Sequence, residues 1–206
     1  MNASCFVFGA GPFYGLVTAP QEGDHILAAD GGYRHCKAIN LTPDLLLGDF
    51  DSLGIPPDTL PVQTFPVEKD DTDTMLALKT GLNLGYRTFH IYGGTGGRMD
   101  HTLANLQALA YLAQQGARGY LYDETYVFTA IYNSSITLPA RSEGIFSVFC
   151  LGPEPKNISI LGGQYGGEHV PLSPFFPLGV SNHFQGKPVT ISVEAGCLLI
   201  GWELPS

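Results

Sequence analysis

The sequence has few basic residues and no long hydrophobic run. Ten Lys and Arg residues face nineteen Asp and Glu residues, and the formal net charge is -9. So few cations leave no basic stripe for a nucleic-acid backbone, so we do not expect nucleic-acid binding. No apolar stretch reaches the roughly eighteen residues of a membrane span, and the first residues lack a basic region ahead of an apolar core. We therefore expect neither membrane insertion nor secretion, and we expect a cytoplasmic protein.

Cysteine and tryptophan are also scarce. The four cysteines, Cys5, Cys36, Cys150 and Cys197, are widely scattered with no Cys-x-x-Cys spacing. A zinc site is therefore not expected, and buried free thiols are the default. With 206 residues and 44% hydrophobic content, the chain is long enough for one large domain or two small ones with a real core.

The pattern of the sequence changes near residue 123. Before it, short apolar runs (5–8, 25–29, 45–47 and 88–92) alternate with helix-like segments (72–84 and 100–114). That alternation predicts a parallel sheet with helices on its faces. After it, β-branched and aromatic runs are separated by Gly, Pro, Asn and Ser (126–132, 135–138, 144–151, 157–161, 189–193 and 197–202). We therefore predict an α/β fold: an N-terminal parallel-sheet domain, 1–122, followed by a C-terminal antiparallel β-sandwich, 123–206.

Aspartates gather where the predicted strands of the first domain end. Asp30 follows the run 25–29, Asp49 and Asp51 follow 45–47, and Asp73 belongs to the cluster 69–73. Ligands of open α/β sheets bind outside the carboxyl ends of the strands. Gathered carboxylates need a positive partner, and Mg²⁺ takes oxygen ligands together with substrate phosphates. We expect Asp49, Asp51 and Asp73 to bind Mg²⁺.

A glycine-rich segment, 93–97, lies between the last strand and the following helix. It lets the backbone approach a ligand closely, and the helix N-terminus offers free N–H groups to phosphate. Arg98 adds a fork of donors, and Lys69 is a further cation beside the aspartates. Asp71 or Asp100 is a candidate to orient or deprotonate an attacking hydroxyl, and sequence does not separate a base from a second metal ligand. The residues predicted to hold the nucleotide are Asp30, Gly31, Lys69, Thr72, Gly94, Thr95, Gly96 and Arg98.

Structural explanations compete with these assignments. A single Asp at a strand end is commonly a cap or turn residue, and Asp71 or Thr72 can cap the helix 72–84. A glycine cluster is commonly a tight turn, although four glycines followed by Arg and a helix favour phosphate binding. His101 is set aside as a capping or packing residue, and Gly9-Ala10-Gly11 can be a plain turn.

These motifs together resemble the thiamine pyrophosphokinase family. The resemblance rests on Ala29–Gly32, Gly48–Ser52, Lys69–Asp73 and Gly93–His101 with Asn105, which occur in the same order in that family. Weaker similarity continues through Leu178–Asn182 and the ending 196–201. One departure is His183, where bacterial relatives are expected to carry an acidic residue, which leaves the detail of the thiamine pocket open.

The resemblance implies transfer of pyrophosphate from ATP to the hydroxyl of thiamine, giving thiamine diphosphate and AMP. It further implies a first domain that holds ATP and Mg²⁺, a second domain that binds thiamine through residues that include Ser181 and Asn182, and a homodimer with the thiamine site at the interface. Three alternatives stay open: a pyrophosphokinase for another small alcohol such as a pterin, a nucleoside phosphate hydrolase, and a non-catalytic thiamine- or nucleotide-binding module.

Overall fold

The computed structural model describes residues 3–48, 60–64 and 71–205, which fall into two compact units. The first unit comprises residues 1–108 and 119–124, and the second comprises 109–118 and 125–206. No helix in the described part of the chain is long and apolar enough to cross a membrane.

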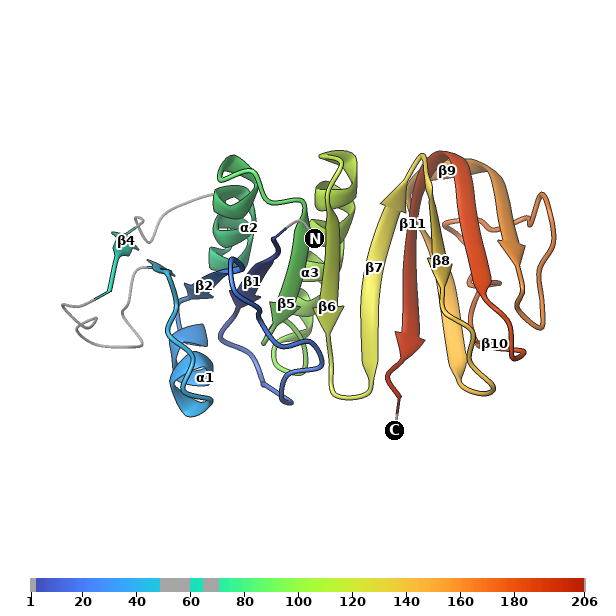
Figure 1. Ribbon diagram of the computed structural model, residues 1–206. Coiled ribbons are helices and arrows are strands. Elements are labelled where there is room, and N and C mark those ends of the chain that lie inside the picture. The colour runs from blue at the N-terminus through green and yellow to red at the C-terminus, as the bar shows by residue number, and fades with distance from the viewer. Residues whose placement is uncertain (1–2, 49–59, 65–70, 206) are drawn as a thin grey trace. The chain divides into compact units, whose positions relative to one another are not determined.

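The first unit is built on a parallel sheet with the strand order β5-β1-β2-β3-β4, and β6 lies next to β5 (Figure 1). The central strands are buried because they are almost continuously apolar, as expected for a sheet covered on both faces. The strands are β1 Cys5–Phe8, β2 His25–Ala29, β3 Leu45–Gly48, β4 Val62–Thr64, β5 Thr88–Tyr92 and β6 Arg118–Tyr122.

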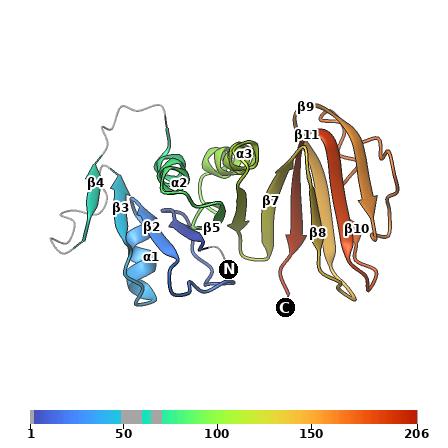
Figure 2. The ribbon, with the colours of Figure 1, turned by 45° about the horizontal axis from the view of Figure 1, so that its top comes forward.

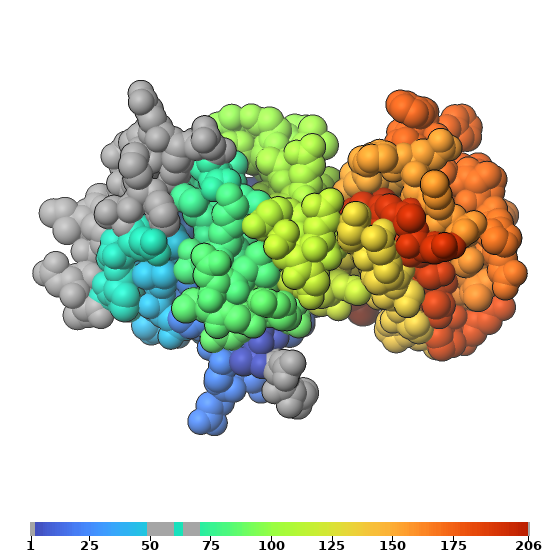
Figure 3. Space-filling model, turned by 90° about the horizontal axis from the view of Figure 1, so that it is seen from above, coloured from blue at the N-terminus to red at the C-terminus, as the bar shows by residue number. Residues whose placement is uncertain are grey.

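In the described residues these strands are connected by the helices α1 Gly32–Ala38, α2 Asp73–Asn83 and α3 Met99–Gln114, and the part of α3 after residue 108 is assigned to the second unit. α2 packs on one face of the sheet, where a Cβ on Gly81 would lie 2.9 Å from the Cys5 sulfur. α1 packs on the opposite face (Figure 2). His35 of α1 stacks there on Phe13. The outward side of α2 is part of the molecular surface (Figure 3). Both faces of the parallel sheet are therefore covered.

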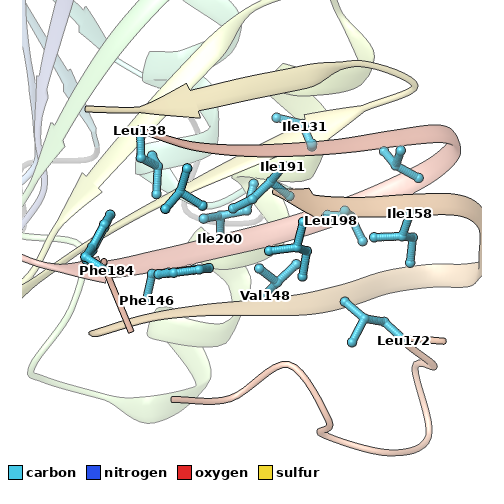
Figure 4. Close-up of a cluster of buried hydrophobic side chains, with 13 residues drawn as sticks. Ile131, Leu138, Phe146, Val148, Ile158, Leu172, Phe184, Ile191, Leu198 and Ile200 are labelled. Atoms are coloured by element: carbon cyan, nitrogen blue, oxygen red, sulfur yellow. The ribbon is translucent and has the colours of Figure 1, made fainter. Parts of the chain in front are cut away.

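The second unit consists of antiparallel strands around one buried hydrophobic cluster. β9 and β11 pair along most of their length; β7 flanks one half of β11 and β8 the other, while β10 flanks β9. Side chains from both halves meet in the cluster, among them Phe146, Leu198 and Ile191 (Figure 4). The strands are β7 Tyr126–Tyr132, β8 Ser135–Leu138, β9 Ile145–Leu161, β10 Asn182–His183 and β11 Val189–Glu203.

The two longest strands each join two of the runs that the sequence pattern separates. Residues 145–151 and 157–161 belong to the single strand β9, and the runs 189–193 and 197–202 belong to β11. The intervening Gly and Pro residues do not end these strands. A Cβ on Gly196 would lie 2.8 Å from Pro155 Cβ, and the register shifts between Ala195 and Cys197. Both strands pass this irregularity together, and pairing resumes beyond it.

The sequence interpretation also missed three elements of the first unit: α1, β4 and β6. α1 begins with Gly32, and β6 contains Gly119. Glycine is unfavourable inside helices and strands, so these segments carried no local signal. Gly32 is required by tertiary packing, because a Cβ there would lie 1.9 Å from the Phe8 carbonyl oxygen.

Candidate functional site

A cavity of about 340 Å³ opens at the carboxyl ends of β1 and β5. The loops that follow the two strands are joined there, since Gly9 N–H donates to Tyr92 O and Gly11 N–H donates to Gly93 O, both at 2.8 Å. The cavity is lined by Ala10, Gly11, Pro12, Gly93, Gly94, Thr95, Gly97, Arg98, His101, Thr102 and Asn105.

Close backbone contact explains the glycines in this wall. Gly93 has a φ of 64°, and a Cβ on it would lie 2.4 Å from the Gly9 carbonyl oxygen. A Cβ on Gly11 would lie 2.8 Å from the Gly93 carbonyl oxygen. Any larger residue would push the two loops apart, so the cavity depends on glycine at these positions.

Two buried side chains hold the glycine loop, residues 93–97, in shape. Asn105 of α3 is buried and its Nδ2 donates to Gly94 O at 2.8 Å. Thr95 is buried as well, and its Oγ1 donates to the Asp123 carboxylate at 2.5 Å. The structure therefore gives the Thr95 hydroxyl a structural partner within the first unit, while its backbone stays in the cavity wall.

Arg98 and Asp100 form an exposed ion pair at the start of α3. Arg98 Nη2 and Nε donate to the two carboxylate oxygens of Asp100 at 2.5 and 3.1 Å. The hydrogen bonds from Arg98 lower the pKa of Asp100 to about 2. Asp100 is therefore ionised at neutral pH, and a carboxylate this acidic is a poor general base there. Arg98 lines the cavity beside the glycine loop.

Asp30 lies at the carboxyl ends of β2 and β3. Its N–H donates to Leu47 O at 2.7 Å, and its φ is 46°. A Cβ on Gly48 would lie 3.3 Å from the Asp30 backbone, and one on Gly31 would lie 2.9 Å from Ala10 Cβ. The structure thus brings predicted Asp30 and Gly31 to the same edge of the sheet as the loop that follows β1.

The start of α2 reaches this edge too. Thr72 caps the helix, with its Oγ1 accepting from Met75 N at 3.2 Å, so its hydroxyl has a structural role. Asp73 is the first helical residue, and the next residue, Thr74, has its hydroxyl oxygen 3.4 Å from a Cβ built on Gly9. Asp71 pairs with Lys79 at 2.6 Å, which keeps a cation beside this carboxylate.

Of the three residues expected to bind the metal, the structure describes Asp73. Asp49, Asp51 and Lys69 lie outside the described residues. Within residues 3–48, 60–64 and 71–205, no group of three or more His, Cys, Asp or Glu side chains is arranged around a common metal position. The donors at this edge, Asp30 and Asp73, are carboxylates, and oxygen donors of this kind fit Mg²⁺ better than a softer metal.

Ser181 and Asn182 belong to the second unit, whereas the glycine loop belongs to the first. Asn182 is buried: its Oδ1 accepts from the backbone N–H of Tyr165 at 3.0 Å, and its Nδ2 donates to Tyr165 O at 2.5 Å. Ser181 has a φ of 60°, and its N–H donates to Ser147 Oγ at 3.1 Å. Asn182 also lines a cavity of about 240 Å³, together with Ile160, Tyr165, Gly166, Val170, Leu172, Leu178, Gly179 and Val180.

Several residues of the first cavity were not predicted from sequence. Ala10–Pro12 follow β1, where Gly9-Ala10-Gly11 was weighed as a plain turn, and His101 had been set aside. Asp123 carried no local signal at all, since its partner Thr95 is 28 positions away. The signal available for residues 10–12 was the glycine-rich turn after the first strand of a parallel sheet.

Two family models match different parts of this chain. The family model described as thiamin pyrophosphokinase, catalytic domain, matches residues 19–121, and the one described as thiamin pyrophosphokinase, vitamin B1 binding domain, matches 134–198. No curated protein gives a significant sequence match.

Solved structures with the same fold come from bacteria and yeasts. A thiamine pyrophosphokinase from Bacillus subtilis is 22% identical with a TM-score of 0.88, and a thiamin pyrophosphokinase family protein from Enterococcus faecalis is 26% identical with a TM-score of 0.83. Each alignment covers 100% of both chains. A thiamin pyrophosphokinase from Candida albicans is 15% identical with a TM-score of 0.74, over 99% of this chain and 90% of that one.

Proposed function

This chain belongs to the thiamin pyrophosphokinase family, so its activity is that of a thiamine diphosphokinase, and we propose how its residues carry out the reaction. The observation that carries the proposal is the cavity between the loops after β1 and β5, which lies in the part of the chain matched by the catalytic-domain model except for residues 10–12. The hydroxyl of thiamine attacks the β-phosphorus of ATP, the bond between the α- and β-phosphates breaks, and AMP leaves.

The glycine loop holds the travelling diphosphate. Transfer of this kind asks the protein mainly for positioning and for neutralisation of phosphate charge. Backbone N–H groups of 93–97 and the start of α3 donate to phosphate oxygens, and Gly94, Thr95 and Gly96 contribute through their backbone. Arg98, now paired with Asp100, is exposed and close enough to the cavity to transfer one or both donors to phosphate.

An acidic enzyme that handles phosphates needs a bound cation, and carboxylate side chains are suited to hold one. Asp49, Asp51 and Asp73 would hold Mg²⁺, which supplies neutralisation of the phosphate charges when bound. Asp30, Gly31, Lys69 and Thr72 complete the proposed nucleotide site. Asp71 and Asp100 each have a cationic partner, Lys79 and Arg98. These ion pairs support a role for the two carboxylates in charge balance or in orienting the thiamine hydroxyl.

We place thiamine binding in the C-terminal domain that the sequence predicts, residues 123–206, and nucleotide binding in the N-terminal domain, residues 1–122. The vitamin B1 binding model matches residues 134–198, which include Ser181 and Asn182 and the whole lining of the 240 Å³ cavity. Thiamine has an aromatic ring system and a positive charge, so apolar walls in a protein of net charge -9 suit it. Ser181 and Asn182 shape this region.

A homodimer is part of the proposal. The second unit exposes an apolar surface that we name the 165–180 patch, in which Phe175 is 92% exposed, Phe176 65% and Tyr165 63%. Leu178 and Val180 belong to the same patch. Large apolar side chains exposed to this degree are typical of an interaction surface, and a second copy of the chain is the partner that the family resemblance implies. The cytoplasmic location expected from the sequence stays a prediction.

One experiment separates this function from the alternatives. The purified protein is incubated with ATP and Mg²⁺ and with thiamine, a hydroxymethyl pterin, or no added alcohol, and AMP is quantified. AMP that forms only with thiamine supports the proposal. AMP with the pterin indicates a different acceptor, AMP without any alcohol indicates a hydrolase, and binding of thiamine without turnover indicates a non-catalytic module.

A further inference from the structure

The segment Pro12–Thr18 follows the cavity wall formed by residues 10–12 and contacts the glycine loop at Gly96. Gly96 has a φ of 75°, and a Cβ on it would lie 2.2 Å from the Tyr14 hydroxyl oxygen and 3.2 Å from both Tyr14 Cζ and Pro12 Cγ. Neither Gly96 nor Tyr14 is among the residues that line the cavity. The Tyr14 ring therefore supports the loop on its outer side.

Tyr14 is held in place by its neighbours in the segment. Its side chain is 44% exposed, and no residue in the described part of the chain forms a hydrogen bond with its hydroxyl. Phe13, the preceding residue, packs against Phe8 and Tyr92 and stacks on His35 with ring centroids 5.3 Å apart. His35 Nε2 in turn donates to Gly11 O at 2.7 Å. The start of the segment is thus fixed to β1, β5 and α1.

The end of the segment is fixed by two tyrosine hydroxyls. Tyr92 donates to Thr18 O and accepts from Thr18 N–H, both at 3.0 Å. The Tyr122 hydroxyl oxygen lies 3.3 Å from Thr18 Oγ1 and 2.9 Å from His90 Nδ1. The Tyr122 ring stacks on the Tyr92 ring, with centroids 4.6 Å apart. Tyr92, Tyr122 and His90 are all buried. Buried polar groups with fixed partners are costly to rearrange, so Thr18 is a firm anchor.

Tyr92 links this anchor to the glycine loop directly. It is the last residue of β5 and precedes Gly93, and its carbonyl accepts from Gly9 N–H. One side chain therefore fixes the far end of the 12–18 segment while its own backbone begins the loop on which Tyr14 rests. Movement of Tyr92 would therefore displace both the 12–18 segment and the glycine loop.

We propose that Tyr14 is a positioning residue for nucleotide binding, which acts through Gly96, and that the Thr18 anchor holds it there. Without the ring, the glycine loop loses its outer support, and its N–H donors no longer point at the phosphates of a nucleoside triphosphate. This inference rests on the proposed function for the identity of the ligand. It adds two positions, Tyr14 and Tyr92, that no motif of the sequence marked.

The test uses the full chain with Mg²⁺ and an ATP analogue that has a methylene group between the α- and β-phosphorus. Calorimetry gives its Kd, and steady-state kinetics give separate KM values for ATP and thiamine. Tyr14→Ala should weaken analogue binding and raise the KM for ATP by about tenfold to a hundredfold, as misplacement of a binding group does, while the KM for thiamine stays unchanged. Tyr14→Phe should resemble wild type, because the ring remains. Tyr132→Ala, at a tyrosine of similar exposure in the second unit, is the matched control and should leave the Kd unchanged.

A second set of variants tests the contact itself. Gly96→Ala should lower both Tm and nucleotide affinity, because its new methyl group meets the Tyr14 hydroxyl. Gly96→Ala combined with Tyr14→Phe removes that oxygen and should recover part of both losses. Tyr92→Phe should reproduce the ATP-specific defect of Tyr14→Ala.

The outcomes separate the inference from the proposed reaction. A Tyr14→Ala protein whose Kd for the analogue stays within twofold of wild type would overturn the positioning role, as would a Gly96→Ala defect that Tyr14→Phe leaves unchanged in both Tm and Kd. If the wild type binds the analogue but makes no thiamine diphosphate, the reaction is wrong, and the binding constants alone decide the role of Tyr14.

Discussion

The hydrogen bond from Asn105 to the glycine loop can be tested by a substitution that replaces one side-chain nitrogen with oxygen. Asn105→Asp keeps the shape of the side chain but replaces the Nδ2 donor, 2.8 Å from Gly94 O, with an oxygen. Asn105 is only 6% exposed, so water does not replace the lost donor. A lost hydrogen bond together with an unsatisfied buried carbonyl costs about 2 to 3 kcal/mol. For a chain of this length that corresponds to a fall in Tm of roughly 4 to 12 °C.

The pH dependence of the variant sharpens this prediction. Burial next to a carbonyl oxygen raises the pKa of the new carboxyl above the ordinary value of about 3.9, and the protonated form can again donate to Gly94 O. For a group whose pKa is raised on folding, the stabilising contribution is present at low pH and is lost as the pH rises through the folded pKa. The Tm difference between wild type and Asn105→Asp should therefore shrink on acidification.

Differential scanning calorimetry from pH 7 downward measures both effects. Asn133→Asp is the matched control, because Asn133 uses its Oδ1 to accept from Gly196 N at 2.7 Å and Asp keeps that acceptor. It should leave Tm almost unchanged. An Asn105→Asp protein as stable as wild type at pH 7, or one whose deficit does not depend on pH, would refute the assigned hydrogen bond.

Three further predictions concern charge and protonation. Arg98→Ala should reduce kcat by about a hundredfold to a thousandfold, which is the usual effect of losing one preorganised donor. Turnover within twofold of wild type would return the glycine loop to the role of a tight turn. Asp51→Asn should lower turnover by about a hundredfold or more, because even residues that only hydrogen-bond to a metal ligand contribute about tenfold to a hundredfold, while the Tm without ligand stays nearly constant. Chelation should abolish the activity of the wild type, and added Mg²⁺ should restore it. Full activity of the variant at ordinary Mg²⁺ would show that Asp51 is not a metal ligand. Burial lowers the pKa of His90 below its ordinary 6.5, so the stabilising contribution of its neutral form is complete above that pH and is lost as the pH falls below it. His90→Gln should therefore flatten the dependence of Tm on pH below 6.5, and a slope equal to that of wild type would contradict the assignment.

Local patterns in the sequence predicted the parts of the fold that depend on local chemistry. The strands Cys5–Phe8, His25–Ala29 and Thr88–Tyr92 are apolar runs buried on both faces, and the start of α2 follows a Thr cap. α1 was missed because Gly32, at its start, is required by a close contact with the carbonyl of Phe8. Tertiary packing, which no short window of sequence contains, decided that segment.

The same distinction applies to the candidate site. The glycine loop and the Asp30-Gly31 pair stand at strand ends, so their position at the sheet edge was predictable from order along the chain. The supporting contacts were not, because Thr95 meets Asp123 across 28 positions and Thr18 meets Tyr92 across 74. The Arg98–Asp100 pair was also missed: both residues were predicted, but as separate donors and acceptors rather than as partners.

The measurement that tests the account most directly identifies the bond that breaks in ATP. The enzyme is incubated with thiamine, Mg²⁺ and ATP labelled at the β-phosphorus, and nucleotides and thiamine esters are separated and counted. We predict equal amounts of AMP and of thiamine diphosphate that carries the label, because the glycine loop and the metal hold the two terminal phosphates as one unit. Formation of ADP with unlabelled thiamine monophosphate would contradict attack at the β-phosphorus and, with it, the proposed function of the site.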